Sequence, residues 1–146
     1  MADIPEEHLT EELLDRLLAS ASIEQYLDEG LVSARTLTDY LFDRKEAHGL
    51  KRADVVRASG LNSTVVYDIF SGKSRPGRDH AIMLAFGLKC TLRETQRLLR
   101  LAGVSELWCK QRRDAIIIWC IRNGFDRIAT DDELYRMGEA TLLPAD

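Results

Sequence analysis

Helix caps and glycines divide this sequence into short segments, and this punctuation constrains the fold more than any other feature. Side chains that can cap a helix precede apolar residues at helical spacing, at Thr10, Ser22, Thr36, Asn62, Thr91, Asp114 and Thr130. Such a side chain accepts a hydrogen bond from a backbone N–H of the first helical turn. Glycines stand where the segments end, at Gly30, Gly49, Gly60, Gly72, Gly87, Gly103 and Gly124. We therefore expect an all-α fold built from short helices.

The segment 115–122 is the one place where a strand competes with a helix. It is apolar on every face and rich in β-branched residues, which also suits a buried strand. We favour a helix capped by Asp114, because the flanks carry helix caps and no second strand is available for pairing. A last helix is expected from Thr130 to Met137. The sequence shows no internal repeat.

Charge is distributed unevenly along the chain. The 146 residues carry a net charge of −4, but residues 1–48 sum to −8, residues 49–113 to +8 and residues 114–146 to −4. A basic middle between acidic ends is expected if one surface meets a polyanion. The alternative is a charge-mixed helical surface without a partner, because basic stretches are often merely solvated. Charge alone leaves both interpretations open.

The segment from Gly49 to Gly77 has the pattern of two short helices packed across each other at a tight turn. Gly60 is the expected turn residue, since such a turn needs a positive φ. The residues expected to pack inward are Ala53, Val55, Val56, Leu61, Val66 and Ile69, with Ala53 closest to the partner helix. The second helix then leaves four side chains facing outward: Ser63, Thr64, Tyr67 and Asp68.

This segment resembles the XRE/Cro/lambda-repressor family of helix-turn-helix proteins. The residues that match the family pattern are Gly60, Leu61, Asn62, Val66, Ile69, Gly72, Lys73 and Pro76. The resemblance extends over residues 36–103, about half of the chain, and implies a five-helix lambda-repressor-like core with extra N- and C-terminal helices. The chain would then comprise an acidic N-terminal helical extension (1–35), the helix-turn-helix domain (36–103) and a C-terminal helical extension (104–146) packed on the core.

The resemblance implies a sequence-specific transcriptional regulator that binds double-stranded DNA, with its recognition helix in the major groove. Carried over by position, the residues facing the bases would be Asn62, Ser63, Thr64, Tyr67 and Asp68. Phosphate contacts would come from Lys51, Arg52, Lys73, Arg75 and Arg78. Family members usually bind paired half-sites as dimers, so a homodimer through the terminal helices is a further expectation.

The alternative is a protein–protein interaction module, adaptor or antitoxin-like, on the same scaffold. The expected recognition helix contains no Arg, Lys or Gln, the residues that make strong bidentate contacts with bases. Asp68 would also repel a phosphate unless it accepts a hydrogen bond from a cytosine amino group. These two features favour the interaction module, whereas the charge distribution and the loop from Gly72 to Arg78 favour DNA.

Other function classes find little support. Cys90, Cys109 and Cys120 lie among apolar neighbours and form no CxxC pair, and the histidines lack zinc-ligand spacing, so neither a metal nor another cofactor is expected. The common motifs of nucleotide-binding enzymes, zinc proteases and serine hydrolases are absent, which argues against an enzyme. Trp108 and Trp119 are expected in the core or in a dimer interface. Without a signal-peptide pattern or a membrane-spanning segment, the expected location is cytoplasmic.

Overall fold

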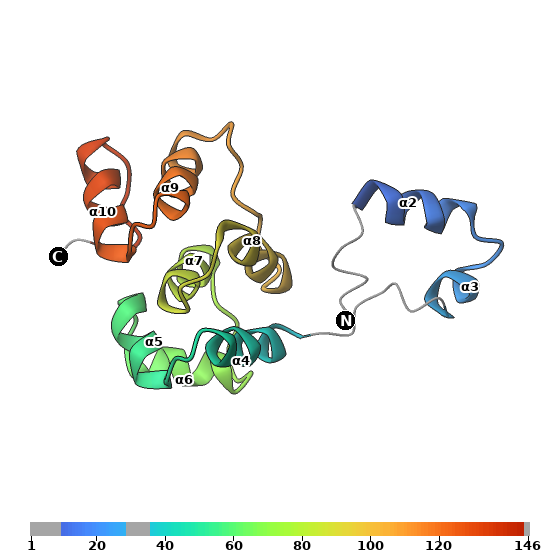
Figure 1. Ribbon diagram of the computed structural model, residues 1–146, viewed down its shortest axis with the longest axis horizontal. Coiled ribbons are helices and arrows are strands. Elements are labelled where there is room, and N and C mark those ends of the chain that lie inside the picture. Colours follow the sequence, from blue (N-terminus) through green and yellow to red (C-terminus); the bar gives the residue numbers. More distant parts are fainter. Residues whose placement is uncertain (1–9, 29–35, 145–146) are drawn as a thin grey trace. The chain divides into compact units, whose positions relative to one another are not determined.

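The computed structural model describes residues 10–28 and 36–144, which form nine α-helices and no strand. The expected all-α class is therefore confirmed. The chain divides into two compact units, Met1–Arg35 and Thr36–Asp146 (Figure 1). The second unit combines the segments 36–103 and 104–146, which we expected as a domain and its extension. None of the described helices is both long and apolar enough to cross a membrane.

The first unit contains α2 (Thr10–Ala19) and α3 (Ile23–Asp28). The Ser22 hydroxyl, just before α3, accepts a hydrogen bond from the N–H of Gln25 at 3.1 Å. Tyr26 is buried. Large apolar side chains remain exposed on both helices, at Leu14, Leu17, Leu18, Ile23 and Leu27. The helix end that we expected at Gly30 lies outside the described residues.

The second unit contains seven of the described helices. They are α4 (Leu37–Ala47), α5 (Arg52–Ser59), α6 (Ser63–Phe70), α7 (Arg78–Gly87), α8 (Leu92–Leu101), α9 (Arg112–Arg122) and α10 (Arg127–Arg136). Thr36 caps α4 by accepting a hydrogen bond from the N–H of Asp39 at 3.2 Å. Thr91 caps α8 in the same way, with the N–H of Glu94 at 3.2 Å. The caps expected at these two threonines are thus confirmed.

The C-terminal helices begin earlier than we expected. Residues 115–122 are helical, which excludes the strand alternative. Asp114 does not cap α9 but is buried within its first turn, where an arginine of α7 binds its carboxylate. Asp126 caps α10 by accepting a hydrogen bond from the N–H of Ala129 at 2.8 Å, and Thr130 is buried inside that helix. In both cases the side chain that we expected to cap the helix is instead buried by tertiary packing.

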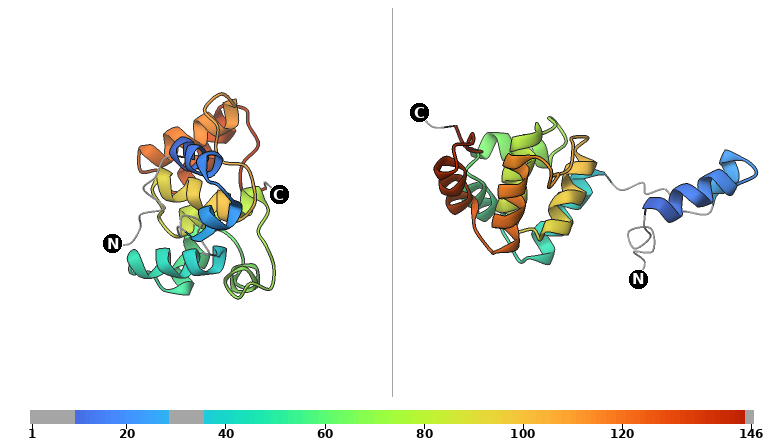
Figure 2. Two further views of the ribbon diagram at one scale, coloured as in Figure 1. Left: turned by 90° about the vertical axis from the view of Figure 1, so that its right-hand side faces the viewer. Right: turned by 90° about the horizontal axis from the view of Figure 1, so that it is seen from above.

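The core of the second unit is centred on α7, which packs against α5, α8 and α10 (Figure 2). Every residue from Ala81 to Ala85 is buried. Gly87 permits the close approach of α5, because a Cβ at this position would lie 2.8 Å from both the Ser59 Cβ and the Val55 carbonyl oxygen. Ala53, which we expected to be the small residue closest to α6, is exposed. The close helix contact that a small residue permits is instead the one between α5 and α7, at Gly87.

The helix pairs α7–α8 and α9–α10 are two copies of one structural unit, which corrects the expectation that the chain has no repeat. α8 and α10 begin and end 35 residues apart, and Arg78-Asp79 of α7 recurs at the same distance as Arg113-Asp114 of α9. Equivalent buried residues are Ile82 and Ile117, Thr95 and Thr130, Leu99 and Leu134, and Leu107 and Leu142. Few equivalent positions are identical, so the sequence pattern alone conceals the repeat.

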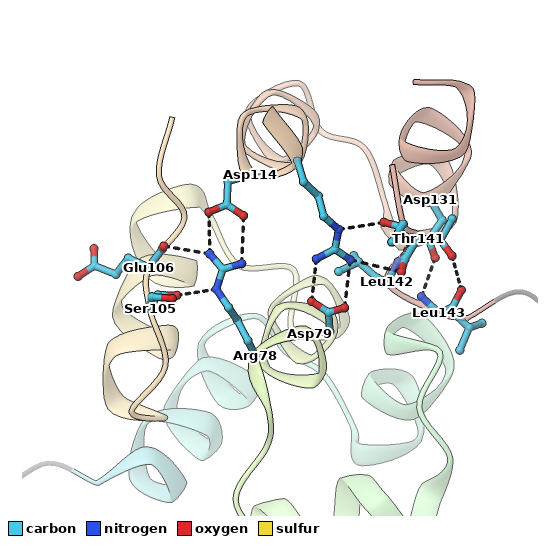
Figure 3. Close-up of polar contacts among 11 residues, drawn as sticks. Arg78, Asp79, Ser105, Glu106, Asp114, Asp131, Thr141, Leu142 and Leu143 are labelled. Carbon is cyan, nitrogen blue, oxygen red and sulfur yellow. Dashed lines mark hydrogen bonds and ion pairs between the residues drawn. The ribbon is translucent and has the colours of Figure 1, made fainter. Parts of the chain in front are cut away.

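Arg78 and Arg113 join the two copies through matching contacts (Figure 3). The guanidinium of Arg78 donates to both carboxylate oxygens of Asp114, at 3.0 and 2.7 Å. The guanidinium of Arg113 donates to both oxygens of Asp79, at 3.0 Å each. Each arginine also donates to two backbone carbonyls of its own copy, those of Ser105 and Glu106 or of Ala140 and Thr141. These contacts between copies are reciprocal, as they are across a two-fold axis.

Candidate nucleic-acid interface

The turn between α5 and α6 is fixed by three consecutive residues. Gly60 ends α5 with a φ of 82°, in the left-handed region that favours glycine. Leu61 is buried, and its N–H donates a hydrogen bond to the hydroxyl of the buried Ser59 at 3.1 Å. Asn62 then caps α6, because its side-chain oxygen accepts a hydrogen bond from the N–H of Val65 at 2.9 Å. The orientation of α6 is therefore determined by packing and hydrogen bonds at its first turn.

α6 has one buried and one exposed face. Val66, Ile69 and Phe70 are buried, and the Phe70 ring packs edge-on against Phe42 of α4 with their centroids 5.3 Å apart. The candidate base-facing residues lie on the opposite side of the helix. Asp68 is half-buried, and the other four are exposed: Asn62, Ser63, Thr64 and Tyr67. The structure thus brings all five together along one helix and its cap.

Arg52 and Tyr67 form a contact that sequence reasoning missed. The guanidinium carbon of Arg52, the first residue of α5, lies 4.7 Å from the centroid of the Tyr67 ring. A cation above an aromatic face is attracted by the ring's negative electrostatic potential. The contact places a guanidinium beside the exposed face of α6, a helix that has no basic residue of its own. Sequence spacing gave no signal for it, because the two residues belong to different helices.

Three other candidate cations are exposed near the ends of these helices. Lys51 precedes α5, while Lys73 and Arg75 lie in the loop that follows α6. The loop is held by its backbone, since the N–H groups of Lys73 and Ser74 donate to the Asp68 carbonyl at 2.9 and 3.2 Å. Arg75 donates a longer hydrogen bond, 3.4 Å, to the Leu101 carbonyl. Cations therefore lie along the chain on both sides of α6.

Arg78 differs from these cations in its contacts. Its Nε and both Nη atoms donate hydrogen bonds within the protein, to Asp114 and to two backbone carbonyls. Its side chain is only 27% exposed. The expected role of Arg78 in binding phosphate does not fit this geometry, because the guanidinium is occupied in joining α7 to α9. Arg78 is therefore not part of the candidate interface.

Internal ion pairs neutralise part of the basic middle of the sequence. Arginines from this stretch pair with carboxylates at Arg57–Asp54, Arg78–Asp114, Arg100–Glu106, Arg112–Glu139 and Arg113–Asp79. Within the described part of the chain, Lys51, Arg52, Lys73 and Arg75 have no carboxylate partner within 4.0 Å. The positive charge that remains available to an outside partner therefore includes the cations that flank α6.

The cysteines have three different environments. Cys120 is buried and Cys90 is half-buried, whereas Cys109 is exposed. Burial raises the pKa of the Cys90 thiol to about 12, which keeps it protonated and unreactive at neutral pH. Among residues 10–28 and 36–144, no cluster of three His, Cys, Asp or Glu side chains is placed to hold a metal ion.

Comparisons of this chain with protein-family models, with curated proteins and with solved structures found no match. The family resemblance of the segment 36–103 therefore rests on its own residues. The structural features that bear on function are the face formed by α6, the Arg52–Tyr67 contact and the cations beside them.

Proposed function

We propose that this protein is a sequence-specific regulator that binds double-stranded DNA, with α5 and α6 as an XRE-type helix-turn-helix within a five-helix core, α4–α8. The observation that carries the proposal is the exposed polar face of α6, flanked along the chain by cations that have no carboxylate partner among the described residues. The major groove of B-DNA admits an α-helix, and hydroxyl and amide groups can hydrogen-bond to base edges there. Asn62, Ser63 and Thr64 would provide such groups at the N-terminal end of α6.

The cations divide into two roles under this proposal. Lys51, Lys73 and Arg75 bind phosphates and thereby fix the position of α6 on the duplex. Arg52 lies over the Tyr67 ring and serves the base-reading face, where its planar guanidinium supplies the bidentate donor that α6 lacks. A guanine, which offers two acceptors in the major groove, is the base that such a donor recognises best.

Asp68 supports a second candidate function, a protein-binding module on the same scaffold. Its carboxylate stands on the same helix as the proposed base-reading residues, where a phosphate would be repelled. The exposed leucines of α2 and α3 also offer an apolar surface to a protein partner. Loss of DNA binding in the experiment below would favour this second function.

The experiment is selection of binding sites from a pool of random-sequence duplexes by the full chain. The expected result is enrichment of one motif. The double variant Ser63→Ala/Thr64→Ala should lose enrichment at particular positions of the motif while it retains non-specific binding. Gln111→Ala, which changes an exposed polar side chain before α9, is the matched control and should enrich the same motif as the unchanged protein. No enrichment and no duplex binding at low salt would refute the proposal.

A further inference from the structure

The first residue of α10, Arg127, lies against the turn between α5 and α6. A Cβ at Gly60, the residue of that turn with a positive φ, would lie 2.6 Å from the Arg127 Nε and 2.9 Å from its Cζ. The guanidinium therefore occupies the space that a side chain at position 60 would need. Gly60 thus serves two purposes, because it adopts the left-handed conformation and also admits a side chain from the C-terminal helix pair.

Arg127 is held in this place by Asp131, one turn further along α10. The Arg127 Nη1 donates to the Asp131 Oδ2 at 2.7 Å, and the two side chains are only 11% and 12% exposed. The same carboxylate accepts hydrogen bonds from the N–H groups of Leu142 and Leu143, at 2.6 and 3.2 Å (Figure 3). Arg127 is thus enclosed between the turn and its own carboxylate partner, where it does not present its charge to a phosphate.

The repeat shows that the helix pair itself does not need this ion pair. The residues of the first copy that are equivalent to Arg127 and Asp131 are Leu92 and Gln96. The side chain of Gln96 binds the N–H and the carbonyl of Leu107, at 2.8 Å each, and Leu107 is equivalent to the leucine that Asp131 binds. A neutral amide therefore makes the same backbone contact. Because a buried ion pair adds little stability over an uncharged pair of similar size, the stability of the helix pair does not account for the charges.

The orientation of α6 depends on the turn that precedes it. The main contacts of α6 are with α4 and α5, and its capping residue Asn62 follows the turn directly. Within the turn, the Leu61 N–H donates to the Ser59 hydroxyl at 3.1 Å. A shift of this backbone would change the direction in which α6 leaves the turn, and with it the position of the base-facing side chains.

We propose that Arg127, held by Asp131, positions the turn between α5 and α6 and thereby sets the orientation of the base-reading helix. Arg127 is a positioning residue, because its guanidinium contacts the turn and not the duplex. The C-terminal helix pair then contributes to base recognition without touching DNA. The effect on DNA rests on the proposed function, but the contact with the turn can be tested without a duplex.

The test uses the full chain with the double substitution Arg127→Leu/Asp131→Gln, which introduces the residues of the first copy and leaves the net charge unchanged. Amide hydrogen exchange at Leu61, followed by NMR, is expected to become about 10-fold faster, because the turn loses the side chain that covers it. The midpoint of urea unfolding should stay nearly the same, since a leucine and a glutamine already occupy the equivalent positions of the first copy.

Two further variants separate the contact with the turn from charge and from folding. Glu133→Gln/Arg136→Leu is the matched control: it removes an ion pair of 2.7 Å near the other end of α10 and should leave exchange at Leu61 unchanged. Arg127→Lys keeps a cation for Asp131 but lacks the planar group beside Gly60. Exchange at Leu61 should be faster in this variant too, which provides the test if the double variant does not fold.

The effect on DNA is measured by competition between the selected duplex and single-base variants. Arg127→Leu/Asp131→Gln should lose about 10-fold in discrimination, while the salt dependence of binding stays the same because the phosphate contacts remain. If the unchanged chain selects no duplex, the proposed function fails, and exchange at Leu61 alone decides whether Arg127 positions the turn. The inference is overturned if Leu61 exchanges equally fast in the Arg127 variants and the control, if exchange rises equally throughout the second unit, or if a chain that selects a duplex keeps its discrimination.

Discussion

Asp114 shows how one carboxylate can join distant parts of the fold. It is 3% exposed, accepts two hydrogen bonds from Arg78 and accepts a third from the N–H of Trp108 at 3.0 Å. Burial by itself raises the pKa of Asp114, but the hydrogen bonds from Arg78 and Trp108 and the nearby positive charge outweigh it and hold the pKa below the usual 3.8. The carboxylate is therefore ionised in the folded protein at neutral pH.

Replacing Arg78 by alanine should destabilise the fold in a pH-dependent way. At neutral pH, Arg78→Ala is expected to lower the free energy of unfolding by about 2–4 kcal/mol, because the buried Asp114 carboxylate loses its cation. In the unchanged protein this stabilisation is present above the ordinary Asp pKa and is lost as the pH falls through the lowered pKa. The difference between the two proteins should therefore shrink below about pH 4. Urea unfolding at neutral and acidic pH measures it.

Arg57→Ala is the control for this prediction. Arg57 pairs with Asp54 at 2.7 Å on the exposed surface of α5, where water screens the interaction. Its replacement should leave the free energy of unfolding nearly unchanged at every pH. An equal loss in both variants, or an Arg78→Ala loss that persists in acid, would contradict the role assigned to the Arg78–Asp114 pair.

Arg52 offers a test that separates base recognition from charge. Arg52→Lys keeps the positive charge but removes the planar pair of donors, so discrimination at one base position should fall by about 1–3 kcal/mol. The salt dependence of binding should stay the same, because the number of cations is unchanged. Competition between the selected duplex and single-base variants measures the discrimination. A uniform loss across all positions would instead place Arg52 on a phosphate.

At the scale of helices, much of the structure could be predicted from local sequence. Thr36, Asn62 and Thr91 each cap the helix expected of them, since a cap depends on residues within one turn. The positions of Asp114 and Thr130 inside their helices could not be predicted in this way, because the burial of their side chains depends on residues outside their own helical turn. The Arg52–Tyr67 contact and the α7–α5 approach at Gly87 depend on the packing of separate helices, which residue spacing does not reveal.

The repeat explains an unusual residue between α7 and α8. Lys89 has a φ of 57°, a left-handed backbone conformation that is strained for residues with a Cβ. The equivalent residue between α9 and α10 is Gly124, which has a φ of 78°. Lys89→Gly is therefore expected to raise the free energy of unfolding by about 0.5–1 kcal/mol, as relief of strain exceeds the added freedom of the unfolded chain. Thermal unfolding followed by circular dichroism measures the change.

The reverse substitution is the matched control. Gly124→Lys places a side chain in the left-handed region, where no atom would clash with its Cβ, so any loss of stability reports backbone strain alone. It should destabilise the protein by a similar amount. If Lys89→Gly destabilised the protein instead, the equivalence of the two connections would be wrong.

At the scale of the whole molecule, the chain divides between residues 35 and 36 into two compact units, and residues 104–146 belong to the same unit as the segment before them. The reason is the reciprocal pairing of Arg78 with Asp114 and of Arg113 with Asp79, which links helices 35 residues apart in the sequence. Cap and glycine patterns describe single helices and contain no information about such pairing.

For binding to a polyanion, the net charge of −4 matters less than the distribution of the cations that have no carboxylate partner among the described residues. Several arginines of the basic middle are neutralised by carboxylates within the fold, whereas Lys51, Lys73 and Arg75 have none within ion-pair distance in the described residues. A polyanion binds through charges that are free to displace its counterions. Because these three residues also flank α6, their removal should weaken binding to DNA.

The most direct measurement is the affinity for the selected duplex over a series of salt concentrations, for the unchanged chain and for Lys73→Ala, Arg75→Ala and Arg122→Ala. Proposed phosphate contacts are lost in the first two variants, so the slope of log affinity against log salt should fall by about 1 in each. Arg122, an exposed cation at the end of α9, is the control and should leave the slope unchanged. Equal slopes in all four proteins would contradict DNA binding through α6 and its flanking cations.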